Sequence, residues 1–176
     1  MEHLIADLLD MASIGAGRLS LETKPELADE VLREAVELHQ PLAGEKDITL
    51  VQRDQAEGVF IEGDRQRVMQ VFANLIGNAL KACRAGDAVT LACEPRDGAV
   101  RFSVEDTGPG IEPGLLEHLF DPYWSGPGAR TGVGLGLYIA RGIVERHGGH
   151  IDVESTVGRG TRFCFTIPMA LDGGGA

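Results

Sequence analysis

The chain has 176 residues, a hydrophobic fraction of 43% and a formal net charge of −11, which together indicate one globular domain with its own core. The excess of Asp and Glu (27) over Lys and Arg (16) argues against a nucleic-acid-binding protein, which would carry a basic patch. No apolar run reaches the roughly 20 residues that span a bilayer, and the N-terminus lacks the layout of a signal peptide. Three cysteines without a C-x-x-C pair fit a reducing compartment. We therefore expect a cytoplasmic chain that contacts neither nucleic acid nor membrane.

Residues 4–19 begin as a helix in which the apolar residues Leu4, Leu8, Met11 and Ile14 recur every three or four positions. This stripe predicts a packing partner, which is either a second chain, such as a dimer mate, or the rest of the same domain. Residues 20–25, with the sequence SLETKP, are typical of a linker.

The remainder of the chain alternates between helical and strand patterns, and no internal repeat is visible. The predicted elements, in chain order, are a helix over 27–43, a β-hairpin with strands at 48–52 and 59–62, a helix over 65–84 capped by Asp64, a second hairpin with strands at 88–94 and 100–105, a helix over 134–147, and strands at 150–154 and 161–167. Because hairpins predominate, we expect an α/β fold: a two-layer α/β sandwich with a mixed, mostly antiparallel sheet against helices.

Two glycine clusters, Asp106-Thr-Gly-Pro-Gly110 and Gly132-Val-Gly-Leu-Gly136, bracket a segment rich in Gly, Pro and aromatic residues. The second cluster leads directly into a helix, and free backbone N–H groups at a helix start favour an anion such as phosphate. A dinucleotide fingerprint of the Rossmann type is excluded, because no strand precedes Gly132 and the spacing is G-x-G-x-G. The pattern indicates a nucleotide site with a mobile cover over about 110–134.

Asn74 and Asn78 lie one turn apart on the long predicted helix, and therefore share a face. An amide oxygen is a good ligand for Mg²⁺, and Lys81, one turn further on, could contact a phosphate. Without other signals, these amides could equally be core-edge groups that bond the backbone. Asp106, at the end of a strand before two glycines, could accept a hydrogen bond from an exocyclic amine, or could simply initiate a turn.

His147 and His150 are separated by two glycines, and the first ends a helix while the second starts a strand. A metal site is therefore disfavoured, and His147 is expected to make a favourable contact with the negative end of the helix dipole.

Four segments, FANLIGNALKA, DTGPG, LFDPYW and GVGLGL, resemble in order and spacing the catalytic ATP-binding domain of bacterial two-component sensor histidine kinases. The wider relatives are the GHKL ATPases, which include DNA gyrase, the Hsp90 chaperones and the mismatch-repair ATPases. The resemblance covers about residues 20–168 and extends to the final turn and strand, GRGTRFCFTIP. It implies the Bergerat-type ATPase fold, with Mg-ATP as the bound nucleotide.

The resemblance also implies roles for individual residues. Asn78 would bind Mg²⁺ with Asn74 beside it, Lys81 would contact phosphate, and Asp106 would accept a hydrogen bond from the adenine amine. The other implied residues are Gly108 and Gly110 at the base, Phe120 and Tyr123 as lid anchors, Arg130 as a basic lid residue, Gly132, Gly134, Leu135, Gly136 and Leu137 at the phosphates, and Thr161 as a support of the base pocket. Of these, Asn74, Lys81 and Arg130 would act in the transfer of the phosphoryl group.

Residues 1–22 resemble the C-terminal end of the second helix of the dimerisation and phosphoacceptor domain, followed by a linker. We therefore expect the catalytic domain at 23–170 and a disordered tail at 171–176. The family's phosphorylatable histidine is absent, since no histidine here has the matching context, so the γ-phosphate would pass to a histidine on a separate dimerisation domain. A response-regulator receiver domain would act downstream. The family often places an aromatic residue after the lysine, whereas this chain has Ala82.

Three other functions share the expected fold. A hydrolytic ATPase of the gyrase type uses a glutamate as general base one turn before the metal-binding asparagine, but here that position is Asn74, which cannot accept a proton. A nucleotide-sensing module would bind without catalysis. A serine kinase that acts on an anti-sigma antagonist would lack the N-terminal helix seen here.

Overall fold

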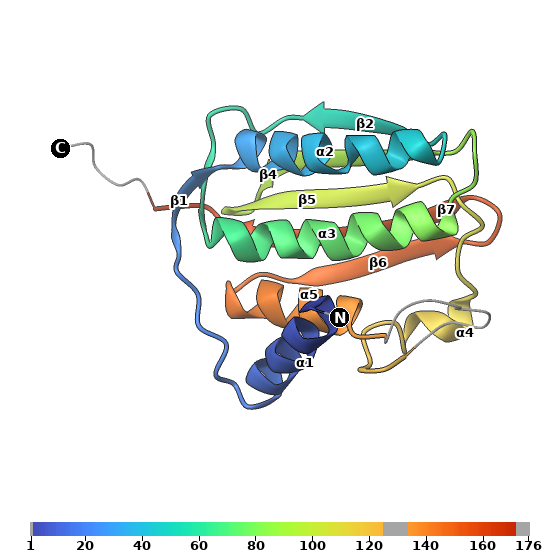
Figure 1. Cartoon of the computed structure of the whole chain (residues 1–176). Coiled ribbons are helices and arrows are strands. Elements are labelled where there is room, and N and C mark those ends of the chain that lie inside the picture. The colour runs from blue at the N-terminus through green and yellow to red at the C-terminus, as the bar shows by residue number, and fades with distance from the viewer. Residues whose placement is uncertain (1, 125–133, 172–176) are drawn as a thin grey trace.

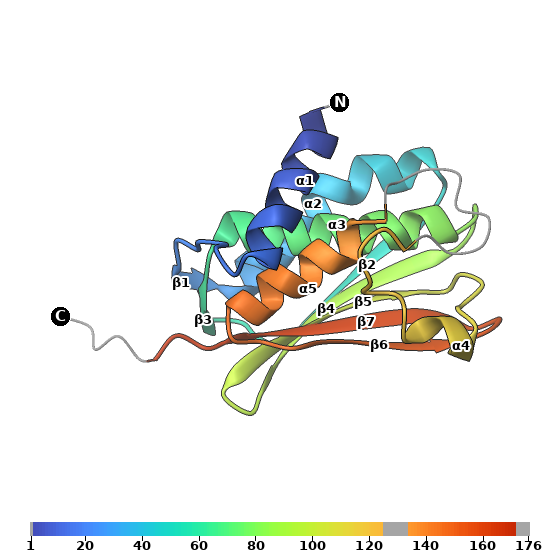
Figure 2. The same ribbon diagram turned by 90° about the horizontal axis from the view of Figure 1, so that it is seen from below.

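The computed structural model describes residues 2–124 and 134–171, and forms two layers, a sheet and a group of helices on one of its faces (Figures 1 and 2). The helices are α1 (Glu2–Gly15), α2 (Ala28–Glu45), α3 (Arg65–Ala82), the short α4 (Pro113–Leu116) and α5 (Gly136–Arg146). The strands are β1 (Lys24–Leu27), β2 (Thr49–Asp54), β3 (Phe60–Gly63), β4 (Ala88–Arg96), β5 (Ala99–Asp106), β6 (Ile151–Thr156) and β7 (Gly160–Pro168). The expected two-layer α/β sandwich is confirmed.

The main sheet has five strands in the order β2-β4-β5-β7-β6. The pairs β4–β5, β5–β7 and β6–β7 are antiparallel, whereas β2 runs parallel to β4. In this register Asp106 lies opposite Thr161, and Thr161 lies opposite Ser155 on the next strand. The mixed, mostly antiparallel sheet is as predicted, and its register places three polar residues side by side at one end.

The predicted hairpin between β2 and β3 is wrong. β2 pairs with β4 after a connection that contains α3, which is the long crossover that two parallel strands require. β3 instead pairs antiparallel with β1 in a separate two-stranded sheet. The expected linker is therefore shorter, because β1 begins at Lys24 within it. An ion pair at 2.9 Å between Glu26 of β1 and Arg65 at the start of α3 supports this small sheet.

The core lies between α2, α3 and α5 and the inner face of the sheet (Figure 2). Phe72 of α3 packs edge-on against Phe102 of β5 and Phe165 of β7, with ring centroids 5.5 and 5.2 Å away. These three side chains are fully buried. They fix the position of α3 over the centre of the sheet, where one face of the helix remains directed toward α5.

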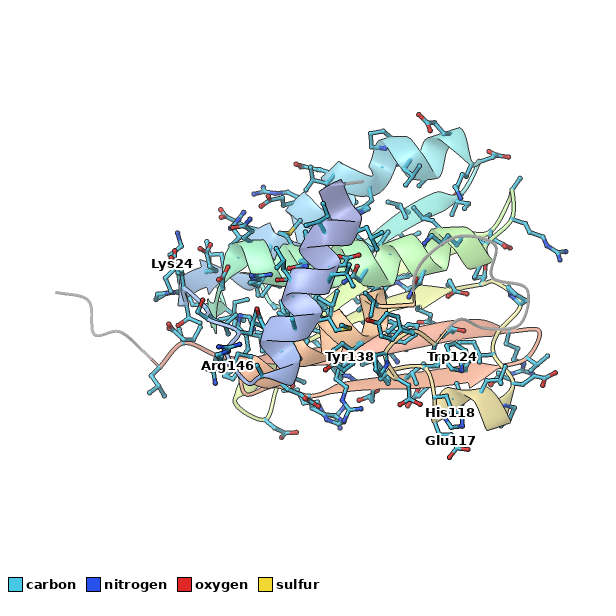
Figure 3. All side chains as sticks on the ribbon, turned by 60° about the horizontal axis from the view of Figure 1, so that its bottom comes forward. Lys24, Glu117, His118, Trp124, Tyr138 and Arg146 are labelled. Atoms are coloured by element: carbon cyan, nitrogen blue, oxygen red, sulfur yellow. The ribbon has the colours of Figure 1, made fainter. Side chains whose placement is uncertain are left out.

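Helix α1 lies across the outer side of α5 and the start of α3 (Figures 2 and 3). The carboxylate of Asp10 accepts hydrogen bonds from Arg67 at 2.9 Å and from Gln70 at 2.7 Å. At the other end of the helix, Ile14 packs over Gly142 of α5. The apolar stripe predicted for this helix therefore packs partly on its own domain, through Met11 and Ile14.

The N-terminal half of α1 is different, because its apolar residues face solvent. The exposed side chains there are Leu4, Ile5, Leu8 and Leu9. Among the described residues, no helix combines the length and the apolar character required to cross a membrane.

Candidate nucleotide-binding site

Asp106 ends β5 and is only 5% exposed. Its carboxylate accepts a hydrogen bond at 2.9 Å from the backbone N–H of Gly108. A side chain at Gly108 would meet this same carboxylate and, at 3.4 Å, the carbonyl oxygen of Ala82. The end of β5 therefore lies directly against the C-terminal end of α3, and Asp106 is held at the junction between them.

Gly110, in the turn that follows Asp106, packs against the turn between β6 and β7. Its φ is +73°, a left-handed conformation that favours glycine, and a Cβ atom here would collide with the backbone of Thr156 and Val157. The backbone of the turn that follows Asp106 is thereby in close contact with the backbone of the β6–β7 turn. The carbonyl of Pro109 accepts a hydrogen bond from the N–H of Gly158 at 2.7 Å, which secures the contact.

A cluster of hydrogen-bonded polar groups stabilises the turn that follows Asp106. Thr161, which is 6% exposed, lies within 2.8 Å of the hydroxyl of Ser155. The same Ser155 oxygen accepts a hydrogen bond from the N–H of Ile111 and donates one to the carbonyl of Gly160. Sequence reasoning identified Thr161 but missed Ser155, because its bond to Ile111 joins residues 44 positions apart and no local signal announces it.

Asn74, Asn78 and Lys81 lie on α3 as expected, on the side of the helix that faces the start of α5. The side-chain oxygen of Asn74 would lie 3.3 Å from a Cβ atom at Gly136, so the two helices touch at this point. Asn78 is half-buried and Lys81 is exposed, and neither side chain makes a hydrogen bond or ion pair with the described part of the chain. Both side chains are available to a ligand beside the C-terminal half of α3.

Helix α5 begins at Gly136 with no side-chain cap and no acidic residue in its first turn. Its N-cap residue, Leu135, is buried (1% exposed), and Leu137 is half-buried. The first N–H groups of the helix, at the positive end of its dipole, therefore have no side-chain cap, and Asn74 lies close to this end of the helix. This arrangement suits an anion.

The lid is anchored at both ends in the described structure. The Phe120 ring packs edge-on against Phe163 with centroids 6.3 Å apart, and the Arg141 guanidinium lies 5.9 Å from the Phe120 centroid. Tyr123 is 55% exposed and has an unusual φ of +62°, whereas Trp124, labelled in Figure 3, packs against the core. At this end of the segment Trp124, rather than Tyr123, is therefore the residue that is partly buried against the core.

Gly134 brings the two ends of the lid together. A Cβ atom on this residue would collide with the backbone of Tyr123 and Trp124. Of the expected site residues, Arg130 and Gly132 lie outside the described residues, as does the predicted tail beyond Leu171.

Burial controls the electrostatics of the site. The pKa of Asp106 is raised, mainly by desolvation, although the N–H groups of Gly108 and Thr161 favour the carboxylate. The nearby charges of Asp87 and Glu105 act in the same direction as burial. A buried carboxylate of this kind is stabilised by a ligand that donates a hydrogen bond to it.

His147 does not make the dipole contact expected of a charged histidine. Burial lowers its pKa, its Nδ1 contacts the carbonyl of Ile143 at 2.8 Å, and its Nε2 accepts a hydrogen bond from the N–H of Asp64 at 3.0 Å. It is therefore a neutral structural link between α5 and α3. No three His, Cys, Asp or Glu side chains in the described ranges are grouped so as to hold a metal ion.

One buried polar atom at the site lacks a partner in the described part of the chain. The amide nitrogen of Asn74 is buried from solvent and forms no hydrogen bond with any described residue. Since buried polar groups are almost always paired, an orphan donor beside a helix N-terminus fits an acceptor supplied by a ligand, such as a phosphate oxygen. The side-chain oxygen of Asn78 is of the type that coordinates Mg²⁺, so the residues present fit a metal–nucleotide complex.

The site and the fold together define an α/β sandwich with a candidate nucleotide site between the end of β5 and the start of α5. The family model described as "Histidine kinase-, DNA gyrase B-, and HSP90-like ATPase" matches residues 63–171. The chain belongs to this ATPase family.

Similar proteins narrow the comparison to histidine kinases. The sensor protein SrrB of Staphylococcus aureus is 40% identical over 109 residues, which are 60% of this chain and 19% of SrrB. The chain therefore spans about a fifth of that relative. Full-length ShkA in complex with AMPPNP matches with a TM-score of 0.86 and 34% identity, over 96% of this chain and 35% of ShkA. The catalytic domain of histidine kinase ThkA matches with a TM-score of 0.76 and 33% identity, over 84% of this chain and 96% of that domain.

Proposed function

We propose that this chain is the catalytic domain of a sensor histidine kinase, which binds Mg-ATP and donates the γ-phosphate to a histidine on a separate dimerisation domain. The observation that carries the proposal is that a single helix, α3, borders both ends of the candidate site. Ala82, at the base end, and Asn74, at the phosphate end, are about 12 Å apart along α3. That separation accommodates a ribose between a base at Asp106 and phosphates at the start of α5.

The chemistry requires positioning rather than a covalent catalyst. A nitrogen of the acceptor imidazole would attack the γ-phosphorus, the bond from phosphorus to the β,γ-bridging oxygen would break, and ADP would leave, while the ring N–H proton of the phosphorylated imidazole would pass to water. The first N–H groups of α5 and the orphan amide of Asn74 would hold phosphate oxygens, and Lys81 would add positive charge. Mg²⁺, held by Asn78, would neutralise charge on the phosphates when bound.

The acceptor and the downstream partner would lie on other domains. Helix α1 would belong to the dimerisation domain that carries the histidine. One ThkA structure, which matches this chain with 29% identity and a TM-score of 0.76, is a complex with the response regulator protein TrrA. By analogy, we propose a response-regulator receiver domain as the recipient of the phosphoryl group.

Hydrolysis of ATP is the less favoured alternative. Asn74 is an amide and cannot act as a general base, and no carboxylate of the described residues takes its position. A module that only senses nucleotide is favoured by no particular observation. The two alternatives and the kinase differ in measurable products.

The test is an isothermal titration with ATP, with and without Mg²⁺, followed by incubation with γ-labelled ATP and a purified dimerisation domain of a histidine kinase. We expect Mg-dependent binding and label on the acceptor histidine. Release of inorganic phosphate without labelled protein would contradict the kinase and indicate a hydrolase. Binding of ATP without either product would indicate a sensing module. Asn78→Ala should remove the Mg²⁺ dependence, while Arg84→Ala, beyond the end of α3, should leave it unchanged.

A further inference from the structure

The hydroxyl of Ser155 is saturated by three hydrogen bonds, one with the segment after β5 and two with the start of β7. It lies 2.8 Å from the N–H of Ile111, 3.0 Å from the carbonyl of Gly160 and 2.8 Å from the hydroxyl of Thr161. A serine hydroxyl has one proton and two lone pairs. Since a carbonyl can only accept, the proton of Ser155 is directed to Gly160, and both lone pairs are left for the other two partners.

The orientation of the Thr161 hydroxyl follows from this count. The Ser155 oxygen has no second proton to offer, so Thr161 must be the donor in the bond between them. The proton of Thr161 is thereby committed to Ser155, and the Thr161 oxygen presents only lone pairs elsewhere.

Thr161 and Asp106 are directly opposite each other on β7 and β5, and both are almost fully buried. Directly opposed residues on one face of a sheet have Cβ atoms about 5 Å apart. The carboxylate of Asp106 is also an acceptor at neutral pH. Two acceptors therefore face the same place, and a ligand there must supply two donor hydrogens, either directly or through a water molecule.

We propose that Ser155 is a positioning residue that determines base specificity by locking Thr161 as an acceptor. The inference rests on the proposed function, in which a purine binds at Asp106. The amine of adenine supplies the donor hydrogens that this arrangement demands. The carbonyl of a 6-oxo purine presents lone pairs to two acceptors and is rejected. Without Ser155, the Thr161 hydroxyl is free to rotate and donate to that carbonyl.

The test compares the affinities of ATP and inosine triphosphate, which differ at the purine 6-position and in the proton on N1. We expect the wild type to prefer ATP. In Ser155→Ala the preference, measured as the ratio of the two Kd values, should fall by about 3- to 10-fold, the effect of one hydrogen bond. Ser155→Thr retains a hydroxyl and should restore the preference. Ser103→Ala, a buried serine on the opposite face of β5, should not alter it.

A double-mutant cycle separates this role from a merely structural one. Thr161→Val should lower the ratio by itself, and Ser155→Ala should cause no further fall in that background, because Ser155 acts through Thr161. Equal weakening of both nucleotides in Ser155→Ala, with an unchanged ratio, overturns the proposal. If Ser155→Ala does not fold, the proposal depends on Thr161→Val, and an unchanged ratio in that variant overturns it. A wild type that binds neither nucleotide overturns the proposed function itself.

Discussion

The N–H of Asp64, the residue that caps α3, donates a hydrogen bond to Nε2 of His147, the residue that caps the C-terminus of α5. Because Nδ1 of the same ring is engaged by the carbonyl of Ile143 at 2.8 Å, the geometry requires a neutral imidazole with its proton on Nδ1. Protonation of Nε2 would place two donors against each other. One titratable ring thus joins the two helices that frame the nucleotide site.

The first prediction concerns pH and stability. The pKa of His147 is lowered in the folded state, mainly by burial, so the unfolded chain binds a proton more tightly. The contribution of His147 is fully present above the unfolded pKa, about 6.5, and is lost as pH falls toward the lower folded pKa. We expect the free energy of unfolding, measured in denaturant, to decline as pH falls below about 6.5. His147→Gln should be less stable at pH 8 and should show a shallower decline, whereas His150→Gln, at an exposed site, should follow the wild type. Parallel curves for wild type and His147→Gln would contradict this assignment.

The second prediction separates function from stability at Asp106. The folded-state pKa of this carboxyl is raised, so its stabilising contribution is present at low pH and is lost as pH rises through the folded pKa. At pH 7 the buried charge therefore opposes folding. Asp106→Asn removes that charge and retains an oxygen for the Gly108 N–H. We expect unfolding stability equal to or above that of the wild type, with ATP affinity reduced beyond detection by calorimetry. Normal affinity in this variant would refute the adenine contact.

The third prediction uses the orphan nitrogen of Asn74. Asn74→Asp preserves the size of the side chain but replaces the buried donor by an acceptor that carries negative charge. ATP should bind at least tenfold more weakly, because phosphate oxygens would meet like charge, while adenosine should bind as it does to the wild type. Calorimetric titration of both ligands checks this. An equal loss of affinity for adenosine would mean that Asn74 supports the fold of the site rather than the phosphates.

The fourth prediction concerns the packing of α1 against α5. A Cβ atom at Gly142 would lie 2.6 Å from Cγ2 of Ile14, so Gly142→Ala should displace α1 from α5. This contact adjoins the hydrogen bond at 2.8 Å between Arg146 and the carbonyl of Leu19, and Figure 3 shows Arg146 beside the end of α1. We expect trypsin to cleave faster after Arg18 in the variant.

Two further variants complete this experiment. Ile14→Ala combined with Gly142→Ala should slow the cleavage again, because it removes the clash. Gly77→Ala is the matched control: no atom lies within 4 Å of its Cβ position, and the substitution should stabilise α3 by about 0.5–1 kcal/mol. Unchanged proteolysis in Gly142→Ala would show that α1 does not depend on this contact.

The fold was predictable where local signals determine it. The β4–β5 hairpin follows from its Asp97-Gly98 turn, in which both residues have positive φ (50° and 77°), as such a tight turn requires. The β2–β3 hairpin was wrong because no such turn joins these strands, and their partners are chosen by distant contacts. The pairing of β3 with β1 depends on packing and on the Glu26–Arg65 ion pair, neither of which periodicity reveals.

The site residues likewise divide into those that local motifs predict and those that depend on contacts between distant segments. Asp106, Asn74 and Asn78 could be proposed from motifs, because their spacing on a strand and a helix is local. Ser155 could not, since its partner Ile111 lies 44 positions away along the chain and meets it only after folding. The lowered pKa of His147 was equally hidden, because it arises from burial between two helices.

The strand order leaves β2 and β6 at the two edges of the five-stranded sheet. Each edge carries charge: Arg53 and Asp54 on β2, and Asp152 and Glu154 on β6. Charged side chains on an edge oppose the addition of a strand from another molecule. Both edges of the sheet are therefore disfavoured as sites of intermolecular strand pairing, and three of these four edge residues also contribute to the acidity of the chain.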